Sequence, residues 1–137
     1  MRIFLDSSAL AKRYIQELGT PQVNDLFIQT DEVFVSMIAL PEVISALTRQ
    51  RIEKKITREQ FNERKSQLIA DFQDFNVCDL TPQVISQTLY LIEGYFLRTL
   101  DAIHLASAIE TKMELFVSSD ARQLKAARAV KIKVLSV

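Results

Sequence analysis

Met-Arg-Ile-Phe-Leu-Asp-Ser-Ser, residues 1–8, joins a short apolar run to an acidic residue and two serines. The apolar run at residues 3–5 is typical of a strand that is buried on both faces of a parallel sheet. The run ends at Asp6, and Ser7 or Ser8 can cap a helix that begins there. We therefore predict that the chain opens with a strand and a helix, with an acid at the carboxyl end of the strand.

The same pattern of short apolar runs separated by helix signals continues along the chain. Further strands are predicted at residues 33–35, 75–77, 115–117 and 132–135. Helices are predicted from Ser7 or Ser8 to about Glu17, from Thr20, from about Leu40 to Arg51, from Thr57 to about Asp74, from Thr81, from Leu100 to Lys112 and from Ala121 to Ala129. Strands that alternate with helices favour a mostly parallel sheet covered by helices on both faces. The pattern therefore predicts an α/β fold.

Several predicted helix ends carry specific signals. Gly19 is a candidate stop for the first helix. The Thr-Pro pair at residues 20–21, repeated at residues 81–82, is typical of a cap followed by proline in the first turn. Residues 57–60, Thr-Arg-Glu-Gln, fit a capping box at the start of a long helix. The apolar stripe of that helix, which is expected in the core or in a groove for a partner helix, consists of Phe61, Leu68, Ile69 and Phe72.

Composition places the chain among globular proteins. Of its 137 residues, 48% are hydrophobic and 25% are charged, and it has two glycines and three prolines, which is unlike a disordered chain. Since there is no repeat and no linker, one domain over residues 1–137 is predicted. No apolar run approaches the roughly 20 residues of a membrane helix, and Asp6 interrupts the first run too early for a signal peptide. Cys78 stands alone, so a reducing, cytoplasmic location is expected.

The formal net charge is zero, whereas a nucleic-acid-binding protein is more often basic. The distribution of charge matters more than the sum, because acids gathered around a cation leave the remaining surface net positive. A basic cluster, which is either a set of solvated helix ends or part of a binding surface, consists of Arg49, Arg51, Lys54, Lys55 and Arg58, with Lys12, Arg13 and Arg98 added to it.

Four acids follow predicted strands or lie in the first turn of predicted helices, namely Asp6, Glu42, Asp101 and Asp120. Ligands of open parallel sheets bind at the carboxyl ends of the strands. Taken singly, each acid has a local explanation, because an acid at a helix N-terminus is stabilised there and Asp120 can simply cap its helix. If all four point into one recess, their repulsion is severe and requires a hard divalent cation. Oxygen ligands favour Mg²⁺ or Mn²⁺ over zinc.

Such a site suits hydrolysis of a phosphodiester bond. One or two metal ions neutralise the phosphate charge, lower the pKa of bound water and stabilise the leaving oxygen. An acid that does not bind metal can orient or deprotonate the water. Rival reactions fit less well, since an aspartyl-phosphate enzyme of the haloacid-dehalogenase kind needs a second Asp two residues after Asp6, where the chain has Ser8. Two glycines cannot build a nucleotide-binding loop.

The chain carries four motifs in order, Phe4-Leu-Asp-Ser-Ser-Ala-Leu-Ala-Lys12, residues 36–49 around Glu42, residues 100–108 with Asp101, and residues 117–124 with Asp120. Together they resemble the PIN-domain nucleases, and within them the VapC-type toxins of prokaryotic toxin–antitoxin modules. The resemblance spans essentially the whole chain. It implies a three-layer α/β/α fold with a mostly parallel five-stranded sheet and Mg²⁺- or Mn²⁺-dependent endoribonuclease activity. It also implies a homodimer and a cognate antitoxin protein as partner.

The resemblance further implies roles for single residues. Asp6 and Asp101 become the central metal ligands, and the other two acids complete a catalytic, metal-binding pocket directly or through water. Ser7 and Ser118 match positions where the family often has a hydroxyl near the acids, and they are expected to orient Asp6 and Asp120. The alternative for both serines is plain helix capping or strand-end chemistry.

Other residues and functions remain open. His104 lies three residues after Asp101 and is a candidate general base, but the family often carries His here without using it so, and a structural role is expected. Tyr90, Tyr95 and Phe96 either stack on RNA bases or pack in the core. The alternative to a nuclease is a catalytically silent PIN-fold domain that binds RNA or protein for regulation.

Overall fold

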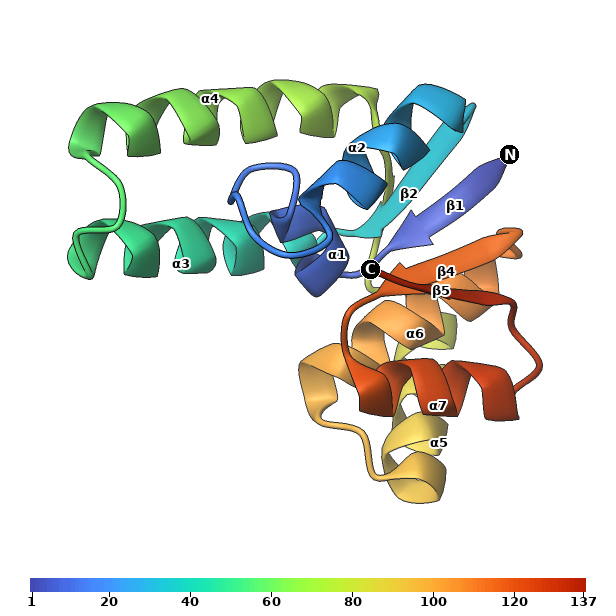
Figure 1. The fold of residues 1–137 in the computed structure, drawn as a ribbon. Helices are drawn as coiled ribbons and strands as arrows, with labels where there is room; N and C mark the ends of the chain where they lie inside the picture. The colour runs from blue at the N-terminus through green and yellow to red at the C-terminus, as the bar shows by residue number, and fades with distance from the viewer.

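The computed structural model describes residues 1–137 and contains five strands and seven helices (Figure 1). The strands are β1 (Arg2–Leu5), β2 (Glu32–Ser36), β3 (Asn76–Cys78), β4 (Leu115–Ser118) and β5 (Val134–Ser136). The helices are α1 (Ser7–Ala11), α2 (Thr20–Gln29), α3 (Ala39–Ile52), α4 (Arg58–Asp74), α5 (Pro82–Tyr95), α6 (Thr99–Thr111) and α7 (Ala121–Ala129). None of the helices combines the length and the apolar character that crossing a membrane requires.

All five strands pair in parallel in the order β3-β2-β1-β4-β5, so the predicted parallel, five-stranded sheet is confirmed. The first strand lies in the middle, where Ile3 is in register with Val33 of β2 and with Leu115 of β4. Helices bury the side chains on both of its faces, which explains why residues 3–5 are apolar without alternation.

Helices cover both faces of the sheet, and each face has its own hydrophobic core. Ile3 and Leu5 belong to a core that includes residues of α1, α2, α3 and α4. Phe4, which points the other way, belongs to a second core with residues of α5, α6 and α7. Figure 1 shows the same division, with α1–α4 on one side of the sheet and α5–α7 on the other. The predicted three-layer α/β/α architecture is therefore confirmed.

The first helix is shorter than predicted and begins with a different cap. Asp6 is the N-cap of α1, and its side chain accepts a hydrogen bond from the Ala9 N–H. The prediction that Ser7 or Ser8 caps this helix was wrong. The helix ends at Ala11 instead of Glu17, since the chain turns there through tighter hydrogen bonds between residues three apart. This turn carries Tyr14 and Ile15 into the core.

Gly19 does not end that helix but caps the next one. It has a φ of 91°, and a Cβ added to it would lie 2.8 Å from the carbonyl carbon of Val137. Thr20 is inside α2, and its hydroxyl bonds the backbone of Ile15 and Glu17 instead of capping. The assignment of Thr20 as a cap was therefore wrong, because a left-handed glycine supplies the turn.

Later helix signals were predicted correctly. Thr57 and Gln60 form both halves of a capping box at the start of α4, and Thr81 caps α5 through the Val84 N–H. α7 has the predicted bounds. In the α4 stripe Leu68 is fully buried and the two phenylalanines pack against the same core, whereas Ile69 is exposed and lies outside the core.

The two edge strands are displaced from their predicted positions. β3 begins one residue late because Phe75 packs with Phe72 against the core instead of entering the sheet. β5 is confined to residues 134–136, because the Ile132 N–H bonds the Ala127 carbonyl oxygen in the turn after α7 instead of entering the sheet. Edge strands pair on one side only, so their apolar pattern is weaker than that of a central strand.

Four members of the predicted basic cluster form ion pairs, and the side chains of Lys12 and Arg13 are also largely buried. Lys12 is buried, and its ammonium donates to the Leu18 carbonyl oxygen at 2.6 Å. Arg13 pairs with Asp71 at 2.9 Å, through an oxygen that also accepts the Tyr14 hydroxyl. Lys12 therefore holds the loop before α2 and Arg13 contacts α4, so little of either side chain is available to a nucleic-acid-binding surface.

Candidate active site

The order of the strands marks one point on the sheet edge as special. The chain builds β1, β2 and β3 outward in one direction and then returns to place β4 and β5 on the other side of β1. The order therefore reverses between β1 and β4. In open parallel sheets, ligands bind in the crevice outside the carboxyl ends of the strands at such a reversal. Asp6 follows β1 and Ser118 ends β4, so both lie at this point.

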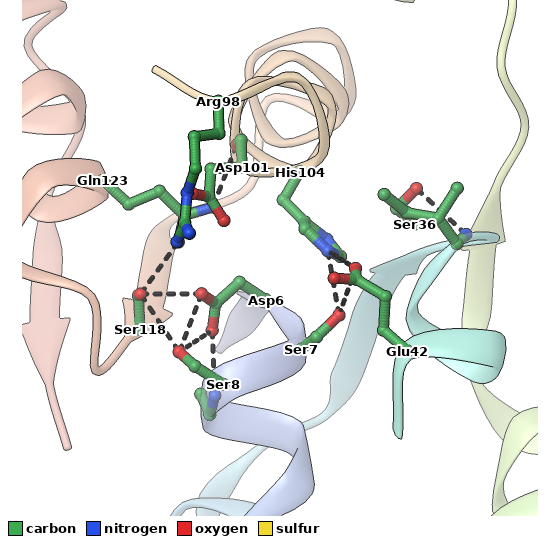
Figure 2. Close-up of polar contacts among 12 residues, drawn as sticks. Asp6, Ser7, Ser8, Ser36, Glu42, Arg98, Asp101, His104, Ser118 and Gln123 are labelled. Carbon is green, nitrogen blue, oxygen red and sulfur yellow. Dashed lines mark hydrogen bonds and ion pairs between the residues drawn. The ribbon is translucent and has the colours of Figure 1, made fainter. Parts of the chain in front are cut away.

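Asp6 is a buried carboxylate surrounded by neutral donors, with only 3% of its surface exposed. Oδ1 accepts the Ala9 N–H at 2.9 Å, Oδ2 accepts the Ser118 hydroxyl at 2.7 Å, and the Ser8 hydroxyl lies 2.8 Å from both oxygens (Figure 2). No lysine or arginine forms an ion pair with it. Burial raises the pKa of the Asp6 carboxyl, although the charge of His104 and the hydrogen bonds act in the opposite direction.

The origin of this raised pKa differs from the sequence-based argument. The prediction attributed it to repulsion among four carboxylates, whereas the largest cause is desolvation of Asp6 itself. A buried carboxylate without a contacting cation is costly. A cation placed beside Asp6 would therefore be strongly stabilising.

Glu42 forms a second polar group with His104 and Ser7, on the side of Asp6 away from Ser118 (Figure 2). Its Oε1 accepts the Ser7 hydroxyl at 2.7 Å and lies 2.5 Å from His104 Nε2, and the Ser7 hydroxyl lies 2.9 Å from the same nitrogen. Burial alone raises the pKa of Glu42, but the hydrogen bonds from His104 and Ser7 outweigh it and the pKa falls below its ordinary value. Glu42 is therefore held as a carboxylate.

His104 comes from α6, a helix whose residues 102–108 are all buried. Its ring is 1% exposed, and its Nδ1 has no hydrogen-bond partner. The ring does not approach a position open to solvent, and its contacts are with Glu42 and Ser7. This agrees with the expected structural role in preference to that of a general base.

Asp101 enters the site from the first turn of α6. Its Oδ2 lies 3.2 Å from Nε of the exposed Arg98. Its backbone carbonyl accepts the Gln123 side-chain amide at 2.9 Å, which joins α6 to α7. In Figure 2 the Asp101 side chain extends from α6 into the space near Asp6.

Asp120 acts as the N-cap of α7. Its Oδ1 accepts the Gln123 N–H at 2.9 Å, and its own N–H donates to the Ser118 hydroxyl oxygen at 2.9 Å. The helix-capping role that the sequence allowed for Asp120 is therefore seen in the structure. Capping occupies one carboxylate oxygen and leaves Oδ2 without a bond to the protein.

The two predicted serines have different partners. The Ser118 hydroxyl contacts the carboxylate of Asp6 and, of Asp120, only the backbone N–H, and its oxygen also lies 3.0 Å from the Gln123 side-chain oxygen. Ser7 bonds Glu42 and His104 instead of Asp6, so that part of the prediction was wrong. The hydroxyl that contacts Asp6 beside α1 is that of the following residue, Ser8.

Sequence reasoning missed Ser8 and Gln123 as members of the polar network. Gln123 is fully buried, and its side chain bridges Ser118 and the Asp101 carbonyl. A signal was present, because glutamine three residues after a capping acid has the spacing of a capping box. Here the side chain turns inward to the site instead of back to the cap, which only the contact between α6 and α7 explains.

The donor chemistry of the site fits a hard divalent cation. Carboxylate oxygens of Asp6 and Asp101 and hydroxyl oxygens are ligands that Mg²⁺ and Mn²⁺ accept, and Asp6 lacks a counter-ion. In the structure, however, no three side chains of Asp, Glu, His or Cys are grouped closely enough to hold a metal ion. The types of ligand atom therefore suit Mg²⁺ or Mn²⁺. Convergence of all four acids on one ion stays a prediction.

The chain belongs to the PIN domain family, whose pattern matches residues 3–129. Ribonuclease VapC45 of Mycobacterium tuberculosis is 29% identical over 111 residues, which are 78% of this chain and 74% of that protein. Two solved structures share the fold. The M. tuberculosis toxin VapC20, described as cleaving the sarcin–ricin loop, has a TM-score of 0.73 at 15% identity and covers 90% of this chain and 94% of its own. A toxin–antitoxin complex from Klebsiella pneumoniae has a TM-score of 0.72 at 16% identity, and the match covers 98% of this chain and 96% of that one.

Proposed function

We propose that this protein is an endoribonuclease that hydrolyses RNA phosphodiester bonds with Mg²⁺ or Mn²⁺ as cofactor. The observation that carries the proposal is Asp6, a buried carboxylate without an ion-pair partner at the strand reversal of a parallel sheet. Membership of the PIN domain family and the similarity to a ribonuclease support the reaction class.

Each acid has a distinct task in this proposal. Asp6 and Asp101 hold the cation, and Glu42 and Asp120 complete the pocket, directly or through water. When bound, the cation supplies charge neutralisation at the phosphate and a lowered pKa for bound water. Both side-chain bonds of Glu42 go to Oε1, so Oε2 is free to accept a proton from an attacking water.

The remaining polar residues keep these acids in place. Ser8 and Ser118 donate to Asp6 and hold its carboxylate in one orientation. His104 and Ser7 do the same for Glu42. Such positioning matters, because small errors in the orientation of catalytic groups reduce rates strongly.

Chelation is expected to abolish RNA cleavage by the purified protein, and Mn²⁺ or Mg²⁺ is expected to restore it, because the acids alone cannot neutralise a phosphate. The measurement is gel analysis of a labelled RNA with EDTA and after adding back each ion. The Asp101→Asn variant is the matched control, and no ion should restore its activity. Cleavage that survives chelation would reject the metal mechanism. RNA binding without cleavage under every ion would instead identify a silent RNA-binding domain.

We further propose that the protein is the toxin of a toxin–antitoxin pair, acts inside the cell as a homodimer and is inhibited by a cognate antitoxin. The relatives named above include a toxin and a toxin–antitoxin complex, which supports this role. Expression of the chain alone is expected to slow bacterial growth, and co-expression of a small protein encoded beside it is expected to relieve the effect. The readout is growth rate after induction, and normal growth at high expression would contradict the toxin role alone.

A further inference from the structure

A groove runs between α7 and the end of α5, outside the candidate active site. It consists of two adjoining hollows of about 630 and 470 Å³ that share Tyr95 and Ala129. We call it the α5–α7 groove. The residues that give it its chemistry are the cations Arg122, Lys125, Lys112 and Lys131 and the aromatic residues Tyr90, Tyr95 and Phe96.

The lining of this groove is positively charged. It includes four lysines and arginines and no acid, although the whole chain has a net charge of zero. The asymmetry extends beyond the groove, because residues 121–137 carry five basic residues and no acidic one. An anionic occupant is therefore favoured by the local charge.

Aromatic side chains stand among these cations. Phe96 is 87% exposed and has a φ of 56°, so a bulky ring is held in solvent on a left-handed turn that seldom accepts one. Tyr90 is 57% exposed and meets Tyr95 edge to face, with ring centroids 6.1 Å apart. Tyr95 packs partly against the core below it, but core packing does not explain the exposed rings of Phe96 and Tyr90. Unstacked nucleobases bind by stacking on aromatic rings, and their phosphates bind to cations beside those rings.

Two lining residues of the groove are close in sequence to residues of the candidate active site. Arg122 lies in the first turn of α7, two residues after Asp120. On the opposite wall, Phe96 lies two residues before Arg98, which pairs with Asp101. Phe96 and Arg122 line the same hollow, and α7 extends from there for about 13 Å along the groove.

We propose that the α5–α7 groove binds single-stranded RNA next to the phosphate that is cleaved, with Phe96 and the tyrosines stacking on bases and Arg122 and Lys125 contacting phosphates. This inference rests on the proposed function and deepens it by assigning the surface that holds the substrate strand beside the acids. A second copy of the chain fits less well, because a symmetric contact through this groove would oppose its cations to their own copies.

The test uses a short, unstructured, fluorescent oligoribonucleotide with the full chain in EDTA, so that binding is measured without cleavage. The double variant Arg122→Glu with Lys125→Glu is expected to raise the Kd at least about tenfold and to flatten its salt dependence, because two phosphate contacts are lost. Phe96→Ala is expected to raise the Kd by about tenfold through lost stacking, with little change in salt dependence.

The matched control is Arg58→Glu with Lys65→Glu, which makes the same charge change at exposed positions of α4. It is expected to bind the oligoribonucleotide within about threefold of wild type, the usual range of a surface substitution. An equal loss in this control, or wild-type affinity in the groove variants, would overturn the proposal. So would groove variants that change the sedimentation of the protein and leave RNA affinity intact.

Cleavage assays separate this inference from the proposed function. With Mn²⁺ present, the groove variants should show a raised KM and a retained single-turnover rate at saturating RNA, because the acids are untouched. If no RNA is cleaved by any form of the protein, the proposed function fails, while the affinities measured in EDTA still decide the groove.

Discussion

Replacing Asp6 with asparagine is expected to reduce RNA cleavage by about a thousandfold or more, the loss of several kcal/mol that a metal site supplies to the transition state. Asp6 is the most buried of the four acids, and it lies at the strand reversal. Asparagine has the same shape but carries no charge, so the variant removes the cation-binding charge and little else.

The fold is expected to survive this substitution. The side-chain oxygen of the introduced asparagine still accepts the Ala9 N–H that caps α1. Its amide group faces the Ser118 oxygen, and the Ser118 hydroxyl then donates to the Gln123 side-chain oxygen, which lies 3.0 Å away. The Asp6→Asn variant therefore keeps every buried polar atom near the substitution paired.

In EDTA the Asp6→Asn variant is expected to be more stable than the wild type at neutral pH. Because burial raises the pKa of Asp6 in the folded state, the unfolded chain ionises first as the pH rises from about 4. The wild type loses stability until the raised folded-state pKa is passed, whereas asparagine titrates at no pH. The difference in melting temperature should therefore be present at pH 7 and vanish below about pH 4.

Melting curves with and without Mg²⁺ check this account together with the cleavage assay. Mg²⁺ should raise the melting temperature of the wild type, since a ligand that binds only the folded state stabilises it, and should not affect Asp6→Asn. A variant that cleaves RNA normally, or that gains the same stabilisation from Mg²⁺, would show that Asp6 does not hold the cation.

Replacing Phe116 with alanine is expected to lower the free energy of unfolding by about 3–5 kcal/mol. Phe116 is fully buried in β4, and its ring stacks on that of Phe4, its register partner in β1, at 5.9 Å between centroids. Small domains are typically stable by about 5–15 kcal/mol. The substitution therefore removes a large part of the total and loosens the two strands that end at the candidate active site.

Urea denaturation followed by circular dichroism measures this effect. The matched control is Phe96→Ala, which deletes the same ring from an exposed position and should change the unfolding free energy by less than about 0.5 kcal/mol. The two variants should thus separate stability from RNA affinity, because Phe96 is assigned to the α5–α7 groove. Equal destabilisation by both would show that the ring of Phe96 packs in solution.

The central part of the fold was predictable from local pattern. The unalternating apolar runs that became β1 and β4 and the capping signals of α4 and α5 each act within a few residues, so sequence alone is enough to recognise them. Residues whose place depends on distant partners were misjudged. The role of Gly19 was misjudged in this way. Glycine is needed there because the backbone of Val137 comes close to it, and a contact between residues so far apart in sequence leaves no local signal.

The candidate site divides in the same way. That acids follow β1 and begin α6 and α7 could be predicted from spacing, and the strand order then brings Asp6 and Ser118 together. Which hydroxyl meets which acid could not be predicted, because neighbouring serines on α1 point in different directions. Ser7 turns toward Glu42 and Ser8 toward Asp6. These directions depend on how the helices on both faces of the sheet pack around α1.

The pairing of β1 with β4 has a consequence for synthesis on the ribosome. Asp6 is translated 112 positions before Ser118, whose hydroxyl orients it. A nascent chain that stops before β4 has neither the neighbouring strand nor α7, so its acids cannot assemble. The candidate active site can therefore form only after β4 and α7 have been translated, and fragments released before that point are expected to lack the proposed nuclease activity.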